Sequence, residues 1–394
     1  MQNKLLINVS PIRRPLTGIG YYTLNILIEL LSKNIEIVGV KNGSMLDKVQ
    51  LGELVEAFSN PEPVIQKPSK IKRSCVELLR NIPGVYSLKN KLLSIRSKRT
   101  LKFLAEQGYI YFEPSFIPFD YNGKTITTIH DLSFISHPEF HPVTRVDFLK
   151  DKIKESINKS DHIIVDSHFI LMELNSLYPA TKSNSSCVYL GVAKTFKHYP
   201  VQDCVSFLSS HNIGYNKFIL SVATLEPRKN LQQLVRAYKL LPEETRRSIP
   251  LVLVGDQGWK NSELFDEAKN LIDKQQIIFT GYVSDSELRL LYASAKLFVY
   301  PSLYEGFGLP VIEAMASGVA VITSNIGATA EVANNSAMLV DPNNISEIRH
   351  AMAEVISNQQ LREKLVADGL ARAEQFSWEN TAREILERAS AIQQ

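Results

Sequence analysis

Short, almost uninterrupted runs of apolar and often β-branched residues recur along the chain, separated by segments long enough for a helix. Strands that are buried on both faces have this continuous apolarity, and their alternation with helices is typical of parallel α/β sheets. The first series of predicted strands is Lys4–Ser10, Ile35–Val40, Tyr109–Glu113, Thr125–His130, His162–Ser167 and Cys187–Gly191. The second series is Phe218–Thr224, Leu251–Asp256, Ile277–Tyr282, Leu297–Ser302, Val319–Ser324 and Ala337–Asp341. Two series predict an α/β protein of two doubly wound domains.

The chain length agrees with this division. The 394 residues exceed the roughly 100–200 residues of one ordinary domain. Lys, His, Pro and Asn residues collect between positions 192 and 215, so we expect the domain boundary there. The predicted domains are 1–200 and 201–375, followed by a terminal segment, 376–394. In doubly wound sheets, ligands are expected at the carboxyl ends of the strands.

Composition narrows the class of protein. The chain is 44% apolar and 22% charged, as is ordinary for a soluble globular protein. No apolar run approaches the roughly 20 residues that span a bilayer, and the segment Met1–Ile7 turns polar too soon for a signal peptide. A cytoplasmic location is therefore expected. Cys75, Cys187 and Cys204 form no C-x-x-C pair, which indicates neither a disulfide framework nor a zinc site.

Candidate chemistry is concentrated after the predicted strand Leu297–Ser302, where Glu305 and Glu313 lie eight residues apart. A glycine-containing turn follows the strand, and a helix is expected from Pro310 to Ser317. Free N–H groups at residues 308–312 would make its N-terminus an anion site that suits a phosphate. Glu313 would then lie in the first helical turn, where an acid also stabilises the helix dipole without any further function.

The Glu305-x7-Glu313 spacing resembles the EX7E signature of retaining glycosyltransferases of family 4, which have the GT-B fold. Further stretches resemble motifs of that family across nearly the whole chain: Thr17–Tyr22, Thr128–Asp131, Ser221–Leu231, Gly281–Ser284 and Glu331–Val332. The stretch Phe376–Glu387 resembles the family's terminal helix, which returns to the first domain, with Ser377 as a plausible N-cap. The resemblance therefore implies two Rossmann-like domains and sugar transfer from a nucleotide donor.

The resemblance also implies roles for individual residues. It assigns Arg228 and Lys229 to the donor phosphates, Glu313 to the ribose hydroxyls, and Glu305 and His130 to the transferred sugar. The residues expected to carry catalysis are thus Glu305, His130, Arg228 and Lys229. Further donor contacts are expected from Gly18, Gly20, Tyr282, Val283, Phe307, Gly308 and Leu309. Acceptor contacts are expected from Tyr21 and Asp131.

The residue types fit these roles, although structural alternatives exist. Arg228 and Lys229 follow a predicted strand and can present a guanidinium fork and a point charge to a phosphate, or else form a solvated basic pair. Gly18 and Gly20 allow unusual φ angles and close approach of a ligand, or else form only a tight turn. They lack the third glycine of a dinucleotide fingerprint, which argues against NAD.

The reaction implied by the resemblance retains the anomeric configuration. Because both glutamates are assigned to binding, we expect a same-face mechanism in which the departing phosphate oxygen takes the acceptor's proton, rather than the nucleophilic carboxylate of retaining glycosidases. The fourteen aspartates contain no Asp-x-Asp pair. We therefore expect no metal ion and no cofactor besides the nucleotide-sugar donor.

The window 66–102 is unusually basic, with eleven Lys or Arg residues and one acid, Glu77, against a net charge of +3 for the whole chain. Leu88, Leu92 and Ile95 would lie on one face of a helix there. A basic amphipathic segment suits an anionic membrane surface. Nucleic acid is disfavoured, since Tyr86 is the window's only aromatic residue, and a solvated helix face is the remaining alternative.

Together these features predict a glycosyltransferase held on the inner face of the membrane. The expected donor is GDP-mannose, because bacterial mannosyltransferases of O-antigen or capsule assembly contain similar stretches, and the expected acceptor is a growing lipid-linked glycan. Three alternatives are a UDP-sugar-dependent transferase, a GT-B-fold sugar-nucleotide epimerase and a catalytically silent subunit of a glycan-assembly complex. The presence of Lys229 and Glu305 argues against the silent subunit.

Overall fold

The computed structural model describes residues 4–59, 98–256 and 262–393 of the chain. The chain forms two compact units. Unit 1 contains the described parts of Met1–Asp166, Ile170–Tyr189 and Trp378–Gln394, and unit 2 those of Ser167–Phe169 and Leu190–Ser377.

Unit 1 is built on a seven-stranded sheet of order β3-β2-β1-β4-β5-β6-β7. Its strands are β1 (Lys4–Asn8), β2 (Glu36–Lys41), β3 (Ser44–Leu46), β4 (Ile110–Glu113), β5 (Thr125–Ile129), β6 (His162–Val165) and β7 (Ser185–Cys187). All neighbours pair in parallel except β2 and β3. The parallel β1 and β4 to β6 are almost wholly buried, as their continuous apolarity predicts.

The sequence pattern missed the antiparallel edge strand β3. Asn42 and Gly43 join β2 to β3 and have φ angles of 50° and 83°. Two positive φ angles are what a tight two-residue hairpin requires, and Asn and Gly tolerate them best. Because β3 has only three residues, Ser44 to Leu46, and none of them is fully buried, it lacks the apolar run by which the other strands were predicted.

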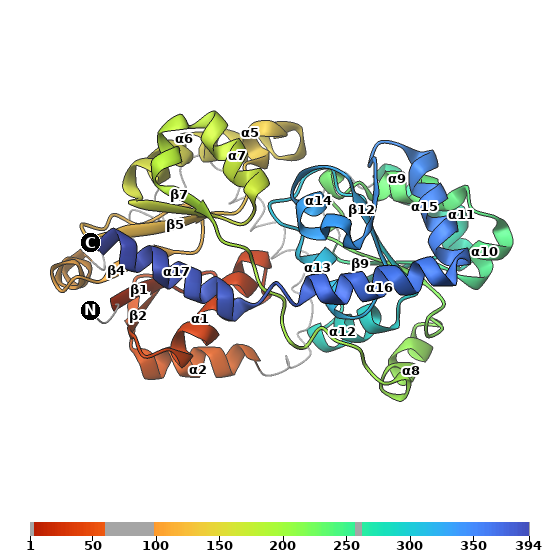
Figure 1. Ribbon diagram of the computed structural model, residues 1–394, viewed down its shortest axis with the longest axis horizontal. Helices are drawn as coiled ribbons and strands as arrows, with labels where there is room; N and C mark the ends of the chain where they lie inside the picture. The colour runs from red at the N-terminus through yellow and green to blue at the C-terminus, as the bar shows by residue number, and fades with distance from the viewer. Residues whose placement is uncertain (1–3, 60–97, 257–261, 394) are drawn as a thin grey trace. The chain divides into compact units, whose positions relative to one another are not determined.

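Helices accompany this sheet (Figure 1). They are α1 (Gly18–Ser32), α2 (Lys48–Ser59), α5 (Ser133–Ser136), α6 (Val143–Lys159), α7 (His168–Leu177) and α17 (Trp378–Gln393), with a further helix at 98–106 and 3₁₀ turns at Pro138–Phe140 and Pro179–Ser183. The terminal helix α17 packs on α1. The Trp378 ring lies 6.1 Å from that of Tyr22, and the Thr381 hydroxyl donates to the Tyr189 carbonyl at 2.7 Å.

Unit 2 is built on a six-stranded, wholly parallel sheet of order β10-β9-β8-β11-β12-β13. Its strands are β8 (Ile219–Val222), β9 (Leu251–Val254), β10 (Ile277–Gly281), β11 (Leu297–Tyr300), β12 (Val321–Ser324) and β13 (Met338–Val340). Its helices are α8 (Val201–Ser210), α9 (Leu231–Lys239), α10 (Glu243–Ser248), α11 (Ser262–Asp273), α12 (Asp285–Ser294), α13 (Leu309–Ala316), α14 (Gly327–Ala333), α15 (Ile345–Ser357) and α16 (Gln359–Ala373), with 3₁₀ turns η3 (Pro227–Lys229) and η4 (Asn334–Ser336). The prediction of two parallel α/β units is thus confirmed.

The unit boundary differs from the predicted limit at residue 200. Residues 190–200 group with unit 2, because this connecting segment bonds to it: the Val192 N–H donates to the Phe376 carbonyl at 3.2 Å. This segment contains no strand. Its composition therefore indicated that a connection between domains lies here, but did not indicate the residue at which one unit ends and the other begins.

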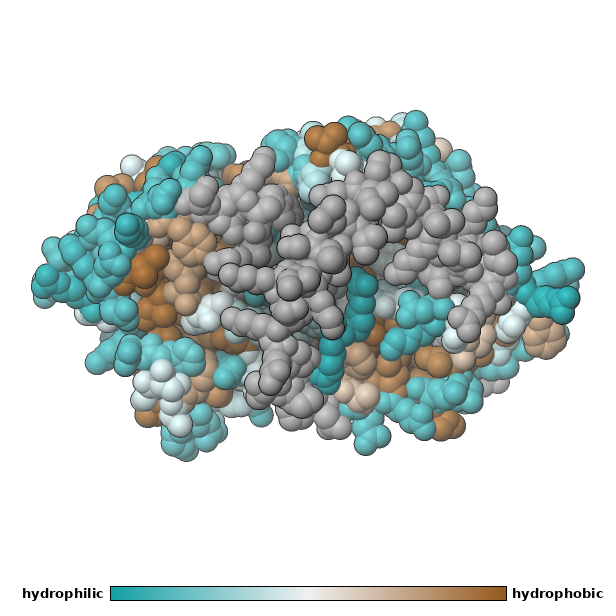
Figure 2. Space-filling model, turned by 180° about the vertical axis from the view of Figure 1, so that it is seen from behind, coloured by the Kyte–Doolittle hydropathy of each residue, from teal (hydrophilic) through white to brown (hydrophobic). Residues whose placement is uncertain are grey.

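Exposed apolar side chains are dispersed over the described surface. On the face in Figure 2, the hydrophobic residues form separate patches among hydrophilic ones. Val49, Val143 and Met172 are the most exposed of the large apolar residues. Within the described residues, every helix is too short or too polar to cross a membrane. The basic window lies outside the described residues up to position 97, and only 98–102 belong to the helix 98–106.

Candidate functional site

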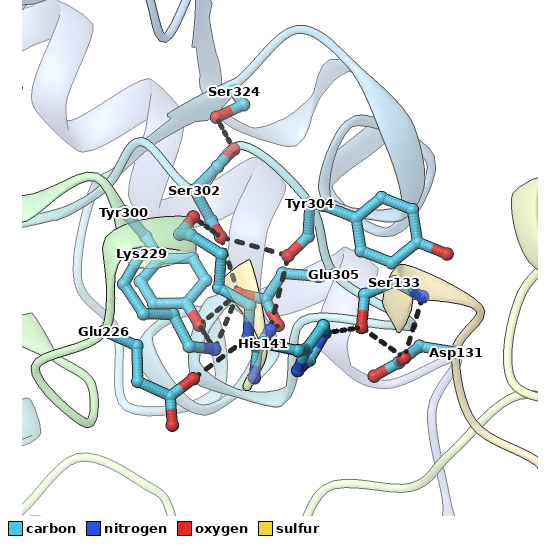
Figure 3. A network of polar contacts seen from close by, with 11 residues as sticks. Asp131, Ser133, His141, Glu226, Lys229, Tyr300, Ser302, Tyr304, Glu305 and Ser324 are labelled. Carbon is cyan, nitrogen blue, oxygen red and sulfur yellow. Dashed lines mark hydrogen bonds and ion pairs between the residues drawn. The ribbon is translucent and has the colours of Figure 1, made fainter. Parts of the chain in front are cut away.

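Glu305 lies in the loop that joins β11 to α13, and its carboxylate is the centre of a buried polar network (Figure 3). Its Oε1 accepts hydrogen bonds from Lys229 Nζ at 2.6 Å, Tyr300 Oη at 2.8 Å and Ser302 Oγ at 2.6 Å. Its Oε2 accepts from Arg228 Nη1 at 2.8 Å. Glu305 and Lys229 are each only 8% exposed. The carboxylate therefore has both basic residues as direct partners.

The η3 turn brings these cations to Glu305. Asn230, which follows η3 and precedes α9, has a φ of 58°. Its side-chain amide donates to the carbonyls of Pro301 at 3.0 Å and Pro342 at 2.7 Å, so it fastens η3 to the loops after β11 and β13. The Leu303 N–H donates to the Arg228 carbonyl at 2.8 Å. The positions of the two cations are thus set by backbone contacts at the carboxyl edge of the sheet.

The charges in this network are balanced. Arg228 Nε also donates to Glu226 Oε2 at 3.1 Å, giving two cations and two anions. Burial alone would raise the pKa of Glu305, but the charges of Arg228 and Lys229 outweigh it and lower that pKa to about 2. Burial lowers the pKa of Lys229, although the charge of Glu305 opposes the shift. Removing one member would leave a buried charge without its partner, which typically costs about 3–5 kcal/mol.

The helix α13 begins one residue earlier than predicted, at Leu309, with Gly308 as its N-cap at a φ of +103°. Pro310 therefore occupies the second helical position and has no N–H to offer, and the Val311 N–H donates to the Gly308 carbonyl at 2.9 Å. The expectation of free N–H groups throughout 308–312 is thus wrong at these two residues. Glu313 lies beyond the first turn, so the interpretation that it only stabilises the helix dipole loses its basis.

The Glu313 carboxylate is half-buried, and its Oε2 accepts a hydrogen bond from Tyr292 Oη at 3.0 Å. Tyr292 belongs to α12 and is fully buried. Burial raises the pKa of Glu313 to about 7, with the charge of Asp285 adding to the shift and the Tyr292 bond opposing it. The two glutamates of the motif are therefore electrostatically different.

The residues 281–284 form the turn between β10 and α12. Gly281 has a φ of +69°, and Tyr282 is 51% exposed. Ser284 caps α12 reciprocally with Glu287: the Glu287 N–H donates to Ser284 Oγ at 3.3 Å, and the Ser284 N–H donates to Glu287 Oε2 at 2.8 Å. The cap fixes the turn while Val283 stays half-buried and Tyr282 is accessible.

Phe307 differs from the other predicted donor contacts. Its side chain is only 3% exposed, and its ring packs edge-on against Phe376 at 5.7 Å. The apolar ring thus belongs to the packing of unit 2. Leu309 at the start of α13 remains half-buried.

In unit 1, the predicted glycine loop is the first turn of α1. The Thr17 hydroxyl caps this helix by accepting from the Gly20 N–H at 3.4 Å. Neither Gly18 nor Gly20 has a positive φ, so the expectation of unusual φ angles is wrong, while close approach of a ligand stays a prediction. A Cβ on Gly20 would lie 3.0 Å from the Pro11 carbonyl oxygen, whereas one on Gly18 would meet nothing within 4 Å. Gly20 therefore serves packing, and Gly18 is open to solvent. Tyr21, which follows Gly20, is half-buried.

His130 follows β5 and is held on both sides of its ring. Its Nδ1 lies 2.7 Å from Asp166 Oδ2, and its Nε2 lies 2.9 Å from the Pro114 carbonyl oxygen. Burial works against the protonated form, but the charge and hydrogen bond of Asp166 outweigh it and raise the pKa of His130. The Tyr22 ring packs edge-on against the imidazole at 4.8 Å.

Asp131, the next residue, belongs to a separate chain of hydrogen bonds (Figure 3). Its Oδ1 accepts from the Ser133 N–H at 3.0 Å and from Ser133 Oγ at 2.7 Å. Ser133 Oγ also lies 2.8 Å from His141 Nε2. One carboxylate oxygen is thereby fixed by the start of α5.

Within the described ranges, no three His, Cys, Asp or Glu side chains gather closely enough to hold a metal ion. The buried acids of the described site lie against lysine, arginine, histidine or tyrosine instead.

The sequence matches the family model of glycosyl transferases group 1 over residues 209–372. O-antigen chain mannosyltransferase B of Escherichia coli is 32% identical over 382 residues, which cover 96% of this chain and 97% of the relative. The chain belongs to the group 1 glycosyltransferases.

Solved structures show the fold of this glycosyltransferase. Anabaena Alr3699/HepE in complex with UDP and glucose is similar with a TM-score of 0.71 and 16% identity, covering 99% of this chain and 100% of that one. WaaG, a glycosyltransferase involved in lipopolysaccharide biosynthesis, is similar with a TM-score of 0.68 and 13% identity, covering 97% of this chain and 98% of that one. The predicted GT-B fold of two Rossmann-like domains is confirmed.

Several polar residues of the glycosyltransferase escaped the sequence analysis. Tyr300 ends β11 and Ser302 follows it, Glu226 lies two residues before Arg228, and Asp166 follows β6. All four follow or end strands, where parallel sheets collect functional groups. That position was the signal that could have found them, whereas Tyr292 is on a helix and had none.

Proposed function

We propose that this glycosyltransferase moves mannose from GDP-mannose to a growing lipid-linked glycan, with retention of configuration. The sugar and its acceptor are inferred from the relative of 32% identity, which is an O-antigen chain mannosyltransferase and is matched over 97% of its length. The observation that best supports a donor site in unit 2 is the cluster formed by Arg228 and Lys229 of the η3 turn with Glu305 on the loop that leads into α13.

In this proposal Glu313 accepts hydrogen bonds from the ribose hydroxyls, and the turn Gly281–Ser284 lies against the base. The donor phosphates bind near the first turn of α13 and are neutralised by Arg228 and Lys229. Both cations are paired with Glu305 in the structure. In this proposal they keep that contact while they bind the phosphates. Glu305 then orients the sugar hydroxyls from a fixed position, because four donors hold its oxygens.

The proposed transfer forms a bond between the acceptor oxygen and the anomeric carbon as the bond to the departing phosphate oxygen breaks. The acceptor's proton passes to that phosphate oxygen, so the products are the glycosylated acceptor and a nucleoside diphosphate. Glu305 is a poor candidate for a nucleophile, because a carboxylate with a pKa of about 2 that accepts four hydrogen bonds is weakly basic. Arg228 and Lys229 stabilise the negative charge that develops on the leaving group.

The first experiment identifies the donor. Purified protein is incubated with GDP-mannose, UDP-glucose and other nucleotide sugars, and donor turnover and thermal stabilisation are measured. Preferential turnover of GDP-mannose with transfer to a lipid-linked glycan supports the proposal. Preference for a UDP-sugar would show the alternative donor class, and a converted nucleotide sugar of unchanged mass would show an epimerase. No turnover with any donor and acceptor would favour a silent subunit.

The second experiment tests the site with Glu305→Gln, which keeps the size of the side chain. Losing one charge-assisted interaction of about 1.5–3 kcal/mol predicts at least a tenfold lower transfer rate. The matched control is Glu267→Gln, which breaks the Arg236–Glu267 ion pair of 2.7 Å on the surface of the same unit. Circular dichroism checks that both variants fold. Near-normal transfer by the folded Glu305→Gln protein would reject the assignment.

The proposed chemistry uses side chains and no metal ion. Transfer is therefore expected to persist in excess EDTA. A strict requirement for added Mg²⁺ or Mn²⁺ would contradict this part of the proposal.

A further inference from the structure

His130 and Asp166 form a polar pair where β5 and β6 end, and the Asp166 carboxylate of this pair is buried. Asp166 follows β6 and is 3% exposed, and its Oδ2 lies 2.7 Å from His130 Nδ1. The other carboxylate oxygen, Oδ1, is buried and has no hydrogen-bond partner among the described residues. A buried carboxylate with one unsatisfied oxygen is costly unless a positive charge lies beside it. His130 is the neighbour able to supply that charge.

The second ring nitrogen decides how the histidine can be protonated. His130 Nε2 lies 2.9 Å from the Pro114 carbonyl oxygen, which can only accept a hydrogen bond. Nε2 must therefore carry a hydrogen. If His130 were neutral and Asp166 ionised, the lone pair of Nδ1 would face a carboxylate oxygen at 2.7 Å, which is repulsive. Both contacts can be hydrogen bonds only if the pair shares one additional proton.

That proton belongs to the imidazole. The ordinary pKa of histidine, 6.5, lies well above the 3.8 of aspartic acid, and the pKa values of both groups are raised here: that of Asp166 by burial, against the charge of His130, and that of His130, despite burial, by the charge and hydrogen bond of Asp166. The other titratable groups at the ring are Asp131, whose negative charge also favours a protonated histidine, and Tyr22, whose pKa is raised by burial and by Asp166. Tyr22 closes a third side of the ring at 4.8 Å, and its hydroxyl bonds to Thr128 Oγ1 at 2.9 Å.

We propose that Asp166 is a positioning residue that, together with the Pro114 carbonyl, holds His130 as a doubly protonated cation with both ring N–H groups directed into the protein. His130 then contributes a fixed positive charge to the transfer, and it cannot act as the base for the acceptor hydroxyl. This inference deepens the proposed function, on which its kinetic consequence rests.

The charge state is tested without any substrate. The eight histidines are labelled with ¹⁵N, and the His130 signals are identified by their loss in His130→Gln. We expect both ring nitrogens to show shifts of protonated nitrogen, and the ring to titrate above the ordinary value of 6.5. A neutral ring at pH 6, or a lone pair on either nitrogen there, would overturn the proposal. The charge state is read from the unaltered protein, and the His130→Gln variant serves only to assign the signals.

The role of Asp166 is tested with Asp166→Asn, which keeps the shape and removes the charge. Burial then lowers the pKa of His130 without the opposing carboxylate, so the ring is expected to titrate below 6.5. The control is Asp120→Asn, which removes an exposed aspartate of unit 1 paired with Lys159 and should leave the His130 titration unchanged. An unchanged His130 titration in Asp166→Asn would also overturn the proposal.

The kinetic readout separates a positioning role from a merely structural one. With donor at saturating concentration, the transfer rate of Asp166→Asn relative to the unaltered protein at the same pH should be at least about tenfold lower at pH 7.5, and the ratio should recover as the pH is lowered and His130 becomes charged again. Taking this ratio cancels the separate pH effect expected of Glu313, which both proteins share. A uniform loss at every pH would mean that Asp166 is only structural. If the unaltered protein transfers no sugar, the proposed function fails while the NMR result still decides the charge of His130.

Discussion

At the scale of single residues, the two motif glutamates differ in how they are held. Glu305 is surrounded by four donors and has a pKa of about 2, whereas Glu313 has one tyrosine partner and a pKa of about 7. The first is ionised at every physiological pH. The second changes charge near neutrality, because the effect of burial outweighs the Tyr292 hydrogen bond and the charge of Arg289.

The pKa of Glu313 therefore predicts that the affinity for a nucleoside diphosphate depends on pH. With a pKa of about 7, roughly a tenth of these carboxyls are ionised at pH 6 and roughly nine tenths at pH 8. If the ionised form accepts the ribose hydroxyls, affinity should rise up to about tenfold across that range. Calorimetric titration at several pH values measures it.

The matched variant for this prediction is Glu313→Gln, which cannot ionise. Its affinity should be low and nearly independent of pH from 6 to 8. Glu113 of unit 1, a buried acid whose pKa burial also raises to about 7, remains in the variant and serves as an internal control. A variant that kept the pH dependence of the original would show that Glu313 is not its source.

At the scale of secondary-structure elements, α13 and the turn before it carry the two glutamates of the proposed donor site. Gly308 caps this helix at a φ of +103°, and Gly318 follows its end at +76°. Both angles are unfavourable for other residues, but the surroundings differ. A Cβ on Gly308 would lie 3.0 Å from Thr329 Cγ2, whereas one on Gly318 would meet nothing within 4 Å.

These two glycines form a matched pair of variants. Gly308→Ala should strain the turn by about 1–3 kcal/mol and, by shifting the first turn of α13, weaken nucleotide binding at least tenfold. Gly318→Ala should cost about 1 kcal/mol of stability and leave binding within about twofold. Urea unfolding and nucleotide titration of both proteins check this. Equal effects on binding would mean that the N-terminus of α13 does not contact the donor.

At the scale of the whole molecule, the most uneven charge lies in the window 66–102, of which the structure describes only 98–102. Its basic residues would attract an anionic membrane, each nearby cation contributing about 1 kcal/mol at low salt. A lipid-linked acceptor would be concentrated at the same surface. Replacing the basic residues of the window should therefore weaken membrane binding and leave the proposed donor site of unit 2 unchanged.

The membrane prediction uses two variants with the same loss of charge. The test variant replaces five basic residues by Gln: Lys89, Lys91, Arg96, Lys98 and Arg99. The control replaces five exposed lysines outside the window: Lys48, Lys194, Lys239, Lys269 and Lys274. The test variant should sediment less with anionic vesicles, most clearly at low ionic strength, while the control changes less and donor affinity stays within a few-fold in both. Equal sedimentation of the two would leave the window as an ordinary solvated surface.

The sequence by itself determined the kind of fold and the location of the chemistry along the chain. Apolar runs mark strands locally, so β8 to β13 and the strands of unit 1 except β3 and β7 could be predicted with ends displaced by a few residues. The run Cys187–Gly191 shares only Cys187 with β7, which begins earlier, at Ser185. The spacing of Glu305 and Glu313 is likewise a property of one short segment. Such features need no knowledge of distant residues.

Only the tertiary structure decided which groups meet. Glu305 bonds to Arg228 from 77 positions away, and His130 bonds to Asp166 from 36 positions away. Each contact depends on neighbouring parallel strands, β8 with β11 and β5 with β6, whose carboxyl ends come together only when the sheet forms. The pKa values of these groups follow from the same contacts and from burial. Sequence could name the charged residues, but the sheet order decided which charges are paired.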